Sequence, residues 1–355
     1  MKPVLFVTNH APAFRVGAFR ALHEAEDVVF ALVGGGLRHG GATPQQLPFP
    51  VIRPAQRTVA RLAASGLFRA VVAGLSGRVA LPGAYLGARS ARVPFVLWAT
   101  IWRHPRTAAH ALSFLPLRRL YRHADAIATH GPHVSAYVRA QGARNPVLEA
   151  PQSVDDGFWG APVDATRHAP FQAMFAGRLE HEKGLAVLLR AWGEAELPDA
   201  ALVVAGDGPL RADAVAAGAH CPGGALAPEE LRGLYAGSDV VVVPSITTRE
   251  FLEPWGLVVN EAFDQGVPVI ATTAVGAVAG GLVRDGETGL VVPSGDAAAL
   301  TSALRRLHGD PQLRARLGAA GRAAVAHGHS HADWARGMSR ALAAAGAGRG
   351  RQPGC

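Results

Sequence analysis

The sequence predicts an α/β protein built from two doubly wound domains, and three observations support this fold class. Short apolar segments rich in Val, Ala and Leu alternate with longer segments whose apolar residues recur at helical spacing. The short segments are apolar throughout, which is typical of parallel strands covered by helices on both faces. The chain has 355 residues, more than a single core of ordinary size holds, so a division into two domains is expected.

The expected strands form two groups along the chain, each interspersed with helices. Because strand and helix alternate within both groups, each group predicts a parallel sheet. The first group of strands is 3–8, 28–33, 70–74, 94–100, 125–129 and 147–149, and the second is 172–176, 201–205, 240–243, 268–271 and 289–292. The helices expected between them are 15–25, 107–122, 132–141, 184–195, 229–236, 256–265 and 297–307.

A polar stretch punctuated by Pro151, Pro162 and Pro170 marks the expected join between the domains. We therefore place the first domain at 1–160 and the second at 161–330. Ligands of doubly wound sheets bind outside the carboxyl ends of the strands. We therefore expect the two domains to face one another across a central cleft that holds the ligand.

The composition excludes a disulfide-bonded or zinc-stabilised scaffold, because only two cysteines occur, Cys221 and Cys355. That usage fits a reducing compartment, and we expect a cytoplasmic protein. No apolar run approaches the roughly 20 residues that span a bilayer. We interpret residues 3–8 as a first strand rather than a signal peptide, and residues 346–355, dominated by Gly and Arg, as a disordered tail.

Positive charge is concentrated in the first 150 residues, which carry a formal balance of +13 against −5 for the remainder. This asymmetry predicts an anionic partner for the first domain, such as the inner membrane face or an acidic substrate. The alternative is compositional, because the chain has 33 arginines and 2 lysines, a bias that a GC-rich genome produces without any partner. Nucleic acid is not expected as a partner, because the basic residues are scattered and no aromatic or recognition-helix pattern accompanies them.

The segment Phe175–Gly184 follows an expected strand and precedes an expected helix. Gly177 lets the chain turn at the strand end, and Arg178 and Lys183 then place two cations over the edge of the sheet. Such a pair suits a diphosphate, because Arg donates two parallel hydrogen bonds and Lys supplies a compact charge. The alternative is a pair of solvated side chains, which applies to Arg178 more than to Lys183, one of only two lysines in the chain.

A second turn, Gly206-Asp207-Gly208-Pro209, directly follows the strand expected at 201–205. Glycines at its first and third positions let a ligand approach the backbone closely, which predicts contact with a nucleotide. The same four residues also make an ordinary turn, so both interpretations stay open.

The most specific signal lies in residues 253–262, after the third strand of the second group. Pro254 suits the first position of a helix. The N–H groups of Gly256, Leu257 and Val258 are then expected to point out of the amino end of that helix. Such an end attracts phosphate through unpaired donors and the helix dipole together.

Two glutamates, Glu253 and Glu261, bracket seven residues of this segment and predict recognition of hydroxyl groups. One carboxylate would bind a sugar hydroxyl while the other holds the ribose of a nucleotide. The alternative is that Glu253 caps the helix and Glu261 lies on the surface. Function is favoured because Glu261 sits among Val259, Ala262 and Phe263, a costly neighbourhood for a carboxylate without a partner.

In order and spacing, these motifs resemble the signature of the retaining GT-B glycosyltransferases of family 4, also called glycosyl transferases group 1. The segments 282–293 and 150–155 are similar to the stretch that follows in that family and to its interdomain hinge. The resemblance covers residues 150–300 well.

The resemblance implies a fold of two Rossmann-like domains, with a C-terminal helix at 331–345 that packs back on the first domain. It implies an enzyme, a hexosyl- or pentosyltransferase. This enzyme moves a sugar from a nucleotide-diphosphate sugar, bound by the second domain, to an acceptor bound by the first. The nucleotide sugar is a co-substrate, and neither a cofactor nor a metal is expected. The acceptor is expected to be a lipid-linked or cell-surface glycan precursor or a small molecule, as in polysaccharide biosynthesis.

By the same resemblance, Arg178 and Lys183 bind the diphosphate, Glu261 binds the ribose hydroxyls and Glu253 binds the transferred sugar. The resemblance also implies retention, with attack on the face that the leaving group vacates. The sequence offers no second positioned carboxylate that could be assigned as a nucleophile. The leaving phosphate is expected to take the acceptor proton. The remaining donor-site candidates are Gly177, Gly206, Gly208, Pro209, Gly256, Leu257 and Val258.

The first domain matches the family less closely, because the loop at 9–17 lacks the paired glycines often found there. Arg15 in this loop is the candidate for contact with a phosphate or an acidic acceptor, with a solvated side chain as the alternative. Relatives often place a histidine near the reacting sugar; His104 is the nearest candidate and His130 its rival. Trp102 is expected to stack on the acceptor.

Other functions share this architecture. A nucleotide-sugar epimerase and a non-catalytic nucleotide-sugar-binding protein stay open as alternatives, although the presence of Lys183 and Glu253 favours transfer. A dinucleotide-dependent dehydrogenase is not supported, because Gly34-Gly35-Gly36 does not fit the Gly-x-Gly-x-x-Gly pattern.

Overall fold

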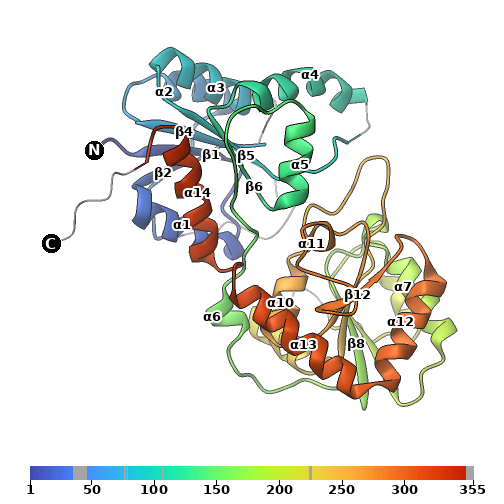
Figure 1. The fold of residues 1–355 in the computed structure, drawn as a ribbon. Coiled ribbons are helices and arrows are strands. Elements are labelled where there is room, and N and C mark those ends of the chain that lie inside the picture. The colour runs from blue at the N-terminus through green and yellow to red at the C-terminus, as the bar shows by residue number, and fades with distance from the viewer. Residues whose placement is uncertain (35–45, 76, 78, 106–107, 224–225, 349–355) are drawn as a thin grey trace. The chain divides into compact units, whose positions relative to one another are not determined.

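The computed structural model describes residues 1–34, 46–75, 77, 79–105, 108–223 and 226–348. The chain forms two compact units, which we call the first domain (Met1–Ser153 with His331–Cys355) and the second domain (Val154–Ser330). Each unit is a parallel sheet with helices on both faces (Figure 1). This arrangement confirms the predicted fold class of two doubly wound, Rossmann-like domains.

The first domain contains a seven-stranded sheet of order β3-β2-β1-β4-β5-β6-β7, and every neighbouring pair is parallel. Alternate residues of β1 enter separate cores: Val4 and Phe6 pack on one face, and Leu5 and Val7 on the other. Burial on both faces explains why the strand sequences are apolar throughout. The strands are β1 (Val4–Thr8), β2 (Val28–Leu32), β3 (Val51–Ile52), β4 (Ala70–Gly74), β5 (Phe95–Ala99), β6 (Ala126–Thr129) and β7 (Val147–Glu149).

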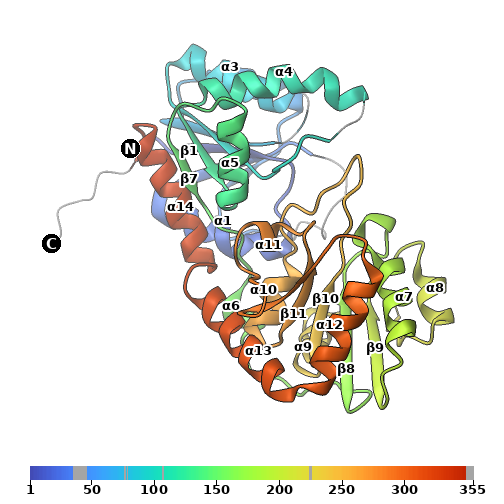
Figure 2. The same ribbon diagram turned by 45° about the vertical axis from the view of Figure 1, so that its right-hand side comes forward.

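The helices of the first domain include one from the end of the chain, α14 (His331–Ala344), which packs on α1 (Ala13–Glu26) and on β6 and β7. Both views show α14, in red, beside α1, in blue (Figures 1 and 2). Trp334 of α14 is fully buried in the core that holds Phe6. The other helices are η1 (Gln56–Thr58), α2 (Val59–Ala63), α3 (Ala80–Ala91), α4 (Ala108–His123) and α5 (Pro132–Ala140).

The second domain contains a five-stranded parallel sheet of order β12-β11-β10-β8-β9. Its strands are β8 (Phe171–Ala176), β9 (Ala200–Ala205), β10 (Val240–Val243), β11 (Val269–Thr272) and β12 (Gly289–Val292). Its helices are α6 (Asp156–Trp159), η2 (His181–Lys183), α7 (Leu185–Ala195), α8 (Arg211–Ala216), α9 (Pro228–Ala236), α10 (Val258–Asp264), α11 (Gly276–Ala279), α12 (Ala297–Gly309) and α13 (Pro311–Ala326).

The boundary between the domains lies at Ser153 and Val154, so the predicted boundary at residues 160 and 161 is wrong by seven residues. The reason is burial: Val154 and Trp159 belong to a core of the second domain. The disordered tail predicted at 346–355 is also wrong at its start, because Ala347 is buried in a core of the first domain. Residues 349–355 of that tail lie outside the described residues.

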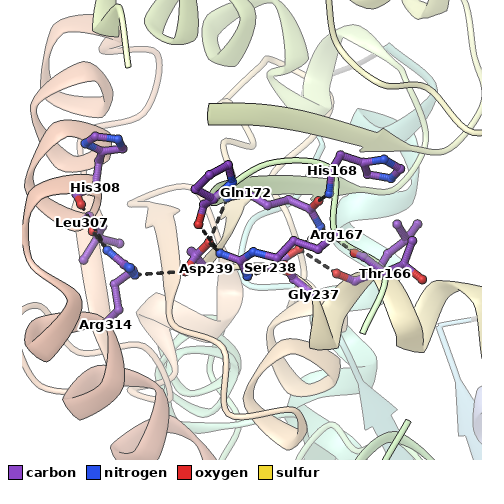
Figure 3. Close-up of polar contacts among 12 residues, drawn as sticks. Thr166, Arg167, His168, Gln172, Gly237, Ser238, Asp239, Leu307, His308 and Arg314 are labelled. Carbon is purple, nitrogen blue, oxygen red and sulfur yellow. Dashed lines mark hydrogen bonds and ion pairs between the residues drawn. The ribbon is translucent and has the colours of Figure 1, made fainter. Parts of the chain in front are cut away.

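A polar network closes the amino ends of β8 and β10 (Figure 3). The Asp239 carboxylate accepts hydrogen bonds from the Arg167 guanidinium and, at 2.9 Å, from the backbone N–H of Gln172. It also lies 3.2 Å from Arg314 Nε. The side-chain amide of Gln172 in turn donates to the Thr166 carbonyl at 3.1 Å. The network fixes the segment that leads into β8, at the sheet edge opposite the one that carries the predicted site.

No helix in the described part of the chain is both long and apolar enough to cross a membrane.

Candidate functional site

The sequence motifs of the second domain meet at the carboxyl edge of its sheet. The order β11-β10-β8-β9 makes the loops that follow these four strands neighbours. These loops carry the Gly177–Gly184 segment, the Gly206–Pro209 turn and the glutamate at 253. In an open parallel sheet this edge is where ligands bind.

The centre of the site is an ion pair between Lys183 and Glu253. Lys183 Nζ donates a short hydrogen bond to Glu253 Oε2, and the same oxygen accepts from Ser245 Oγ at 3.0 Å. Glu253 is only 7% exposed, so its charge depends on these partners. An ammonium has three N–H donors, so the contact with Glu253 does not exhaust the hydrogen-bonding capacity of Lys183.

Lys183 is held in place by a close contact between two loops. Gly184, the next residue, has φ = +73°, and a Cβ there would lie 1.9 Å from the Pro244 carbonyl oxygen. The Ile246 amide donates to the Glu182 carbonyl at 3.0 Å in the same contact. Only glycine fits this position. It allows the segment that carries Lys183 to pack against the loop that carries Ser245 and Glu253.

The loops after β8 and β9 are locked together in the same way. A Cβ on Gly206 would lie 1.9 Å from the Gly177 carbonyl oxygen. The Leu179 amide donates to the Asp207 carbonyl at 2.9 Å. Close packing against the neighbouring loop therefore requires glycine at 206. The sequence had offered the approach of a ligand as one reason for this glycine. At Gly177 itself an added Cβ would come no closer than 4.0 Å to another atom, so its surroundings are open.

Arg178 lies on the β8 loop and is 37% exposed. Its Nη2 donates to Glu182 Oε1 at 3.1 Å, and its Nη1 lies 4.0 Å from Glu180 Oε1. The guanidinium is thus oriented over its own loop. A guanidinium carries five N–H donors, more than these two glutamates use.

The helix predicted to begin at Pro254 begins four residues later, so that part of the prediction is wrong. α10 starts at Val258, and Gly256 has φ = +92°. The preceding residues instead bond to the start of α11: the Gly276 amide donates to the Glu253 carbonyl at 3.1 Å, and the Ala277 amide to the Trp255 carbonyl at 2.8 Å. This tertiary pairing holds Glu253 in an extended conformation at the site rather than at a helix cap.

Glu261 lies on α10 and accepts a 2.7 Å hydrogen bond from the Tyr235 hydroxyl of α9. Burial raises the pKa of Glu261 to about 7, and the hydrogen bond from Tyr235 opposes the rise. The sequence indicated a costly neighbourhood for this carboxylate, and the structure supplies its partner.

Sequence reasoning missed Ser245 and Tyr235. The position of Ser245, two residues beyond a predicted strand, is a usable signal, because side chains at carboxyl ends of parallel strands face the ligand edge. Tyr235 gave no such signal, because its pairing with Glu261 depends on the packing of α9 against α10.

The structure gives each candidate in the first domain its own surroundings. The Trp102 ring packs edge-on against His133 with centroids 5.3 Å apart, and the His104 ring lies 5.1 Å from Phe114. Arg15, interpreted above as either a ligand contact or a solvated side chain, is buried with 5% exposure. Contact of Arg15, Trp102 or His104 with an acceptor stays a prediction.

Within the described residues, no cluster of three or more His, Cys, Asp or Glu side chains is arranged to hold a metal ion.

Comparison with known proteins identifies the second domain. Residues 163–324 match the family described as glycosyl transferases group 1. The second domain is therefore similar to the glycosyl transferases group 1 over most of its length. The matched range contains every site residue described above for the second domain.

Curated glycosyltransferases match less than half of the chain. The D-inositol 3-phosphate glycosyltransferase of Arthrobacter sp. (strain FB24) is 38% identical over 176 residues, which is 44% of this chain and 38% of that protein. The GDP-mannose-dependent alpha-(1-6)-phosphatidylinositol monomannoside mannosyltransferase of Mycolicibacterium smegmatis is 36% identical over 156 residues, 41% of this chain and 40% of that protein. The match thus spans about two fifths of the length of these relatives.

Solved structures match almost the whole chain. The Anabaena protein HepE, crystallised with UDP and glucose, aligns with a TM-score of 0.74 at 17% identity, covering 97% of this chain and 100% of that one. Sucrose-phosphate synthase from Thermosynechococcus elongatus aligns with a TM-score of 0.71 at 18% identity, covering 96% and 98%. At these identities the comparison shows the fold, which is that of GT-B glycosyltransferases.

Proposed function

We propose that this protein is a glycosyltransferase that moves a sugar from a nucleotide-diphosphate sugar to an acceptor bound by the first domain. The observation that carries the proposal is the Lys183–Glu253 pair at the carboxyl edge of the second sheet, held by Ser245 and by the glycine at 184. An ammonium beside a buried carboxylate suits a nucleotide sugar, because the ammonium can bind phosphate oxygens and the carboxylate can bind sugar hydroxyls.

The proposed roles follow the chemistry of each group. Lys183 and Arg178 bind the diphosphate and stabilise the charge that develops on it as it leaves. Glu253 accepts hydrogen bonds from hydroxyls of the transferred sugar, and Glu261 accepts them from the ribose. The amides of Gly256, Leu257 and Val258 donate no backbone hydrogen bond within the described residues, which supports their proposed role as phosphate donors.

Retention without a metal or cofactor is the proposed mechanism. Glu253 is bound to Lys183 and Ser245, and Glu180 and Glu182 lie against Arg178, so these carboxylates serve ion pairs rather than standing as a nucleophile. The two cations supply the positive charge that a divalent ion would otherwise bring to the diphosphate. The leaving phosphate then takes the acceptor proton.

A lipid-linked or cell-surface glycan precursor is the proposed acceptor. By its name, one relative acts on a phosphatidylinositol monomannoside, which is a lipid. The first 150 residues carry a balance of +13, which favours an anionic surface.

Helix α4 is the proposed point of membrane contact. It exposes Leu112 and Leu115 by 83% and 70% and has Arg122 and His123 in its last turn, a combination that suits an interfacial helix. We expect the protein to cosediment with vesicles of anionic lipid and Leu112→Glu to weaken this binding. Equal binding of the variant, or equal binding to neutral vesicles, would contradict a role for α4.

The function is tested by incubating the protein with UDP-, GDP-, ADP- and TDP-sugars and following nucleotide release and product by NMR. One donor is expected to be consumed, slowly by hydrolysis alone and faster with an acceptor, and the product anomer is expected to keep the donor configuration. Epimerised nucleotide sugar as the product would establish an epimerase. Tight donor binding without turnover would establish a binding protein.

The pH dependence of donor binding is expected to report on Glu261. Its pKa of about 7 means that it is largely protonated at pH 6 and largely ionised at pH 8. Because the ionised form accepts hydrogen bonds from ribose hydroxyls better, affinity for a nucleoside diphosphate should rise about tenfold between these values. Calorimetry on wild type and Glu261→Gln measures this, since titration of the ligand phosphate is common to both and cancels.

The variant is expected to bind weakly at pH 8 and to lose the part of the pH dependence that belongs to Glu261. The pH dependence of the free energy of unfolding provides the control. A carboxyl whose pKa rises from 4.5 to about 7 on folding lowers the free energy of unfolding as pH increases through that range, by at most about 1.4 kcal/mol per unit. Glu261→Gln should remove this slope. An unchanged pH profile of binding would exclude Glu261 from the ribose site.

A further inference from the structure

The first domain contains a buried cation that no carboxylate of the described residues neutralises. Arg15 of α1 is 5% exposed, donates a short hydrogen bond from Nη2 to Gln152 Oε1, and has no partner for Nη1. No ion pair involving Arg15 forms among the described residues. Its other neighbours are aromatic: the guanidinium carbon lies 5.0 Å from the Trp98 ring centroid and 6.0 Å from that of Trp334.

This environment is electrostatically costly. Burial lowers the pKa of Arg15 to about 9, which still leaves the guanidinium charged at neutral pH. Arg15 also lies in the first turn of α1, a helix without a side-chain cap or an acidic residue in that turn. The amino end of a helix is the positive end of its dipole, so the helix adds to the charge rather than opposing it.

Further unpaired donors surround the guanidinium. The indole N–H groups of Trp98 and Trp334 and both ring nitrogens of His130 are buried and have no hydrogen-bond partner among the residues that the structure describes. The Trp98 ring centroid lies 5.6 Å from that of His130 and 5.7 Å from that of Trp334. Buried Trp N–H groups normally have a partner. The pKa of His130 is lowered well below its usual value, first by burial and then by Arg15, so the ring is neutral and retains one N–H.

The cluster lies where a doubly wound sheet binds ligands. Trp98 is the second-last residue of β5, and His130 directly follows β6. Gln152 follows β7, and Arg15 is on the helix after β1. These positions share the carboxyl edge of the first sheet. Trp334 reaches the same place from α14.

We propose that Arg15, Trp98, His130 and Trp334 form an oxyanion-binding site in the first domain, which takes a phosphate group or a group of the same charge and shape. The site lies apart from the proposed donor site in sequence and domain, and its test requires neither donor nor transfer. Arg15 supplies the charge, through Nη1, and the indole N–H groups supply neutral donors. The aromatic walls exclude water, which strengthens each of these interactions.

The test is the unfolding midpoint of the whole chain in inorganic phosphate, with sodium chloride at equal ionic strength as the reference. Wild type is expected to gain about 2 °C or more at saturating phosphate. Arg15→Met, which keeps the length of the side chain without its charge, should gain nothing. The matched control Arg20→Met removes an exposed arginine of the same helix, whose side chain is 60% exposed, and should gain as much as wild type.

Two further arms make the result decisive. Trp98→Phe keeps a buried ring but removes one N–H donor, and should reduce the gain in phosphate even if Arg15→Met does not fold. Hexose phosphate compared with free hexose separates the two sources of the anion. A gain with inorganic phosphate indicates a free ion, and a gain with hexose phosphate alone indicates the phosphoryl group of a substrate.

The proposal is overturned if neither phosphate raises the midpoint of wild type, or if Arg15→Met and Trp98→Phe gain as much as wild type. It is also overturned if Lys183→Ala abolishes the gain, because phosphate would then be binding in the second domain. Failure of sugar transfer, by contrast, would leave the phosphate result unaffected.

Discussion

Lys183→Ala is expected to lower kcat/KM for sugar transfer by about 10³-fold, within the range seen when one group that stabilises developing charge is removed. The ammonium is placed to meet the leaving diphosphate, whose negative charge grows as the bond to the sugar breaks. Its removal also takes the ion-pair partner from Glu253, which is 7% exposed and keeps its hydrogen bond from Ser245 Oγ. Steady-state kinetics with the donor identified by the panel measures the effect, and kcat should fall more than KM rises.

Two variants control this result. Arg190→Ala removes a cation from α7 whose side chain is 72% exposed and should leave kcat/KM unchanged. Lys183→Arg keeps the charge but replaces a compact ammonium with a planar fork, so it should recover part of the loss. If Lys183→Ala has the kinetics of wild type, the Lys183–Glu253 pair has a structural role and no role in transfer.

Gly184→Ala is expected to have the largest effect on stability. A Cβ at this position would lie 1.9 Å from the Pro244 carbonyl oxygen, and the residue has φ = +73°. The positive φ alone costs about 1 kcal/mol, and the clash forces the lysine loop away from the loop that carries Glu253. We expect the free energy of unfolding to fall by about 2–4 kcal/mol, with loss of donor binding, as measured by urea denaturation and calorimetry.

The chain offers a matched control for that substitution. Gly193 lies inside α7, and a Cβ there would meet no atom within 4 Å. Gly193→Ala should therefore stabilise the protein by up to about 1 kcal/mol without affecting the donor. A Gly184→Ala variant as stable and active as Gly193→Ala would show that the contact between the two loops does not position Lys183.

Most of the sheet architecture could be predicted because burial on both faces leaves a continuous apolar run, as in Val240–Val243. The strand β3, with two partly buried residues, gave no such run and was missed. Residues 154–160 belong to the second domain rather than the first. The prolines of a polar stretch place the predicted boundary later, whereas the burial of Val154 and Trp159 depends on contacts distant in sequence.

The sequence predicted which residues belong to the site but not which of them contact one another. Spacing placed Glu253 beside a helix end, yet the hydrogen bonds to the start of α11 put it beside Lys183 instead. For the glycine at 206 the sequence leaves a ligand contact and an ordinary turn open, and the close approach of the Gly177 carbonyl explains why glycine is needed there. Arg15 is buried because Trp334 of α14 packs over it, and no local pattern shows that contact.

The most direct test of the account is a calorimetric titration of wild type, Lys183→Ala and Arg190→Ala with UDP, GDP, ADP and TDP. The account predicts that one nucleoside diphosphate binds wild type and Arg190→Ala equally, with one site per chain, and that Lys183→Ala binds it at least about tenfold more weakly, the equivalent of one lost charge-assisted hydrogen bond. Binding that is indifferent to Lys183, or no binding of any of the four at millimolar concentration, would contradict a nucleotide-sugar site at the carboxyl edge of the second sheet.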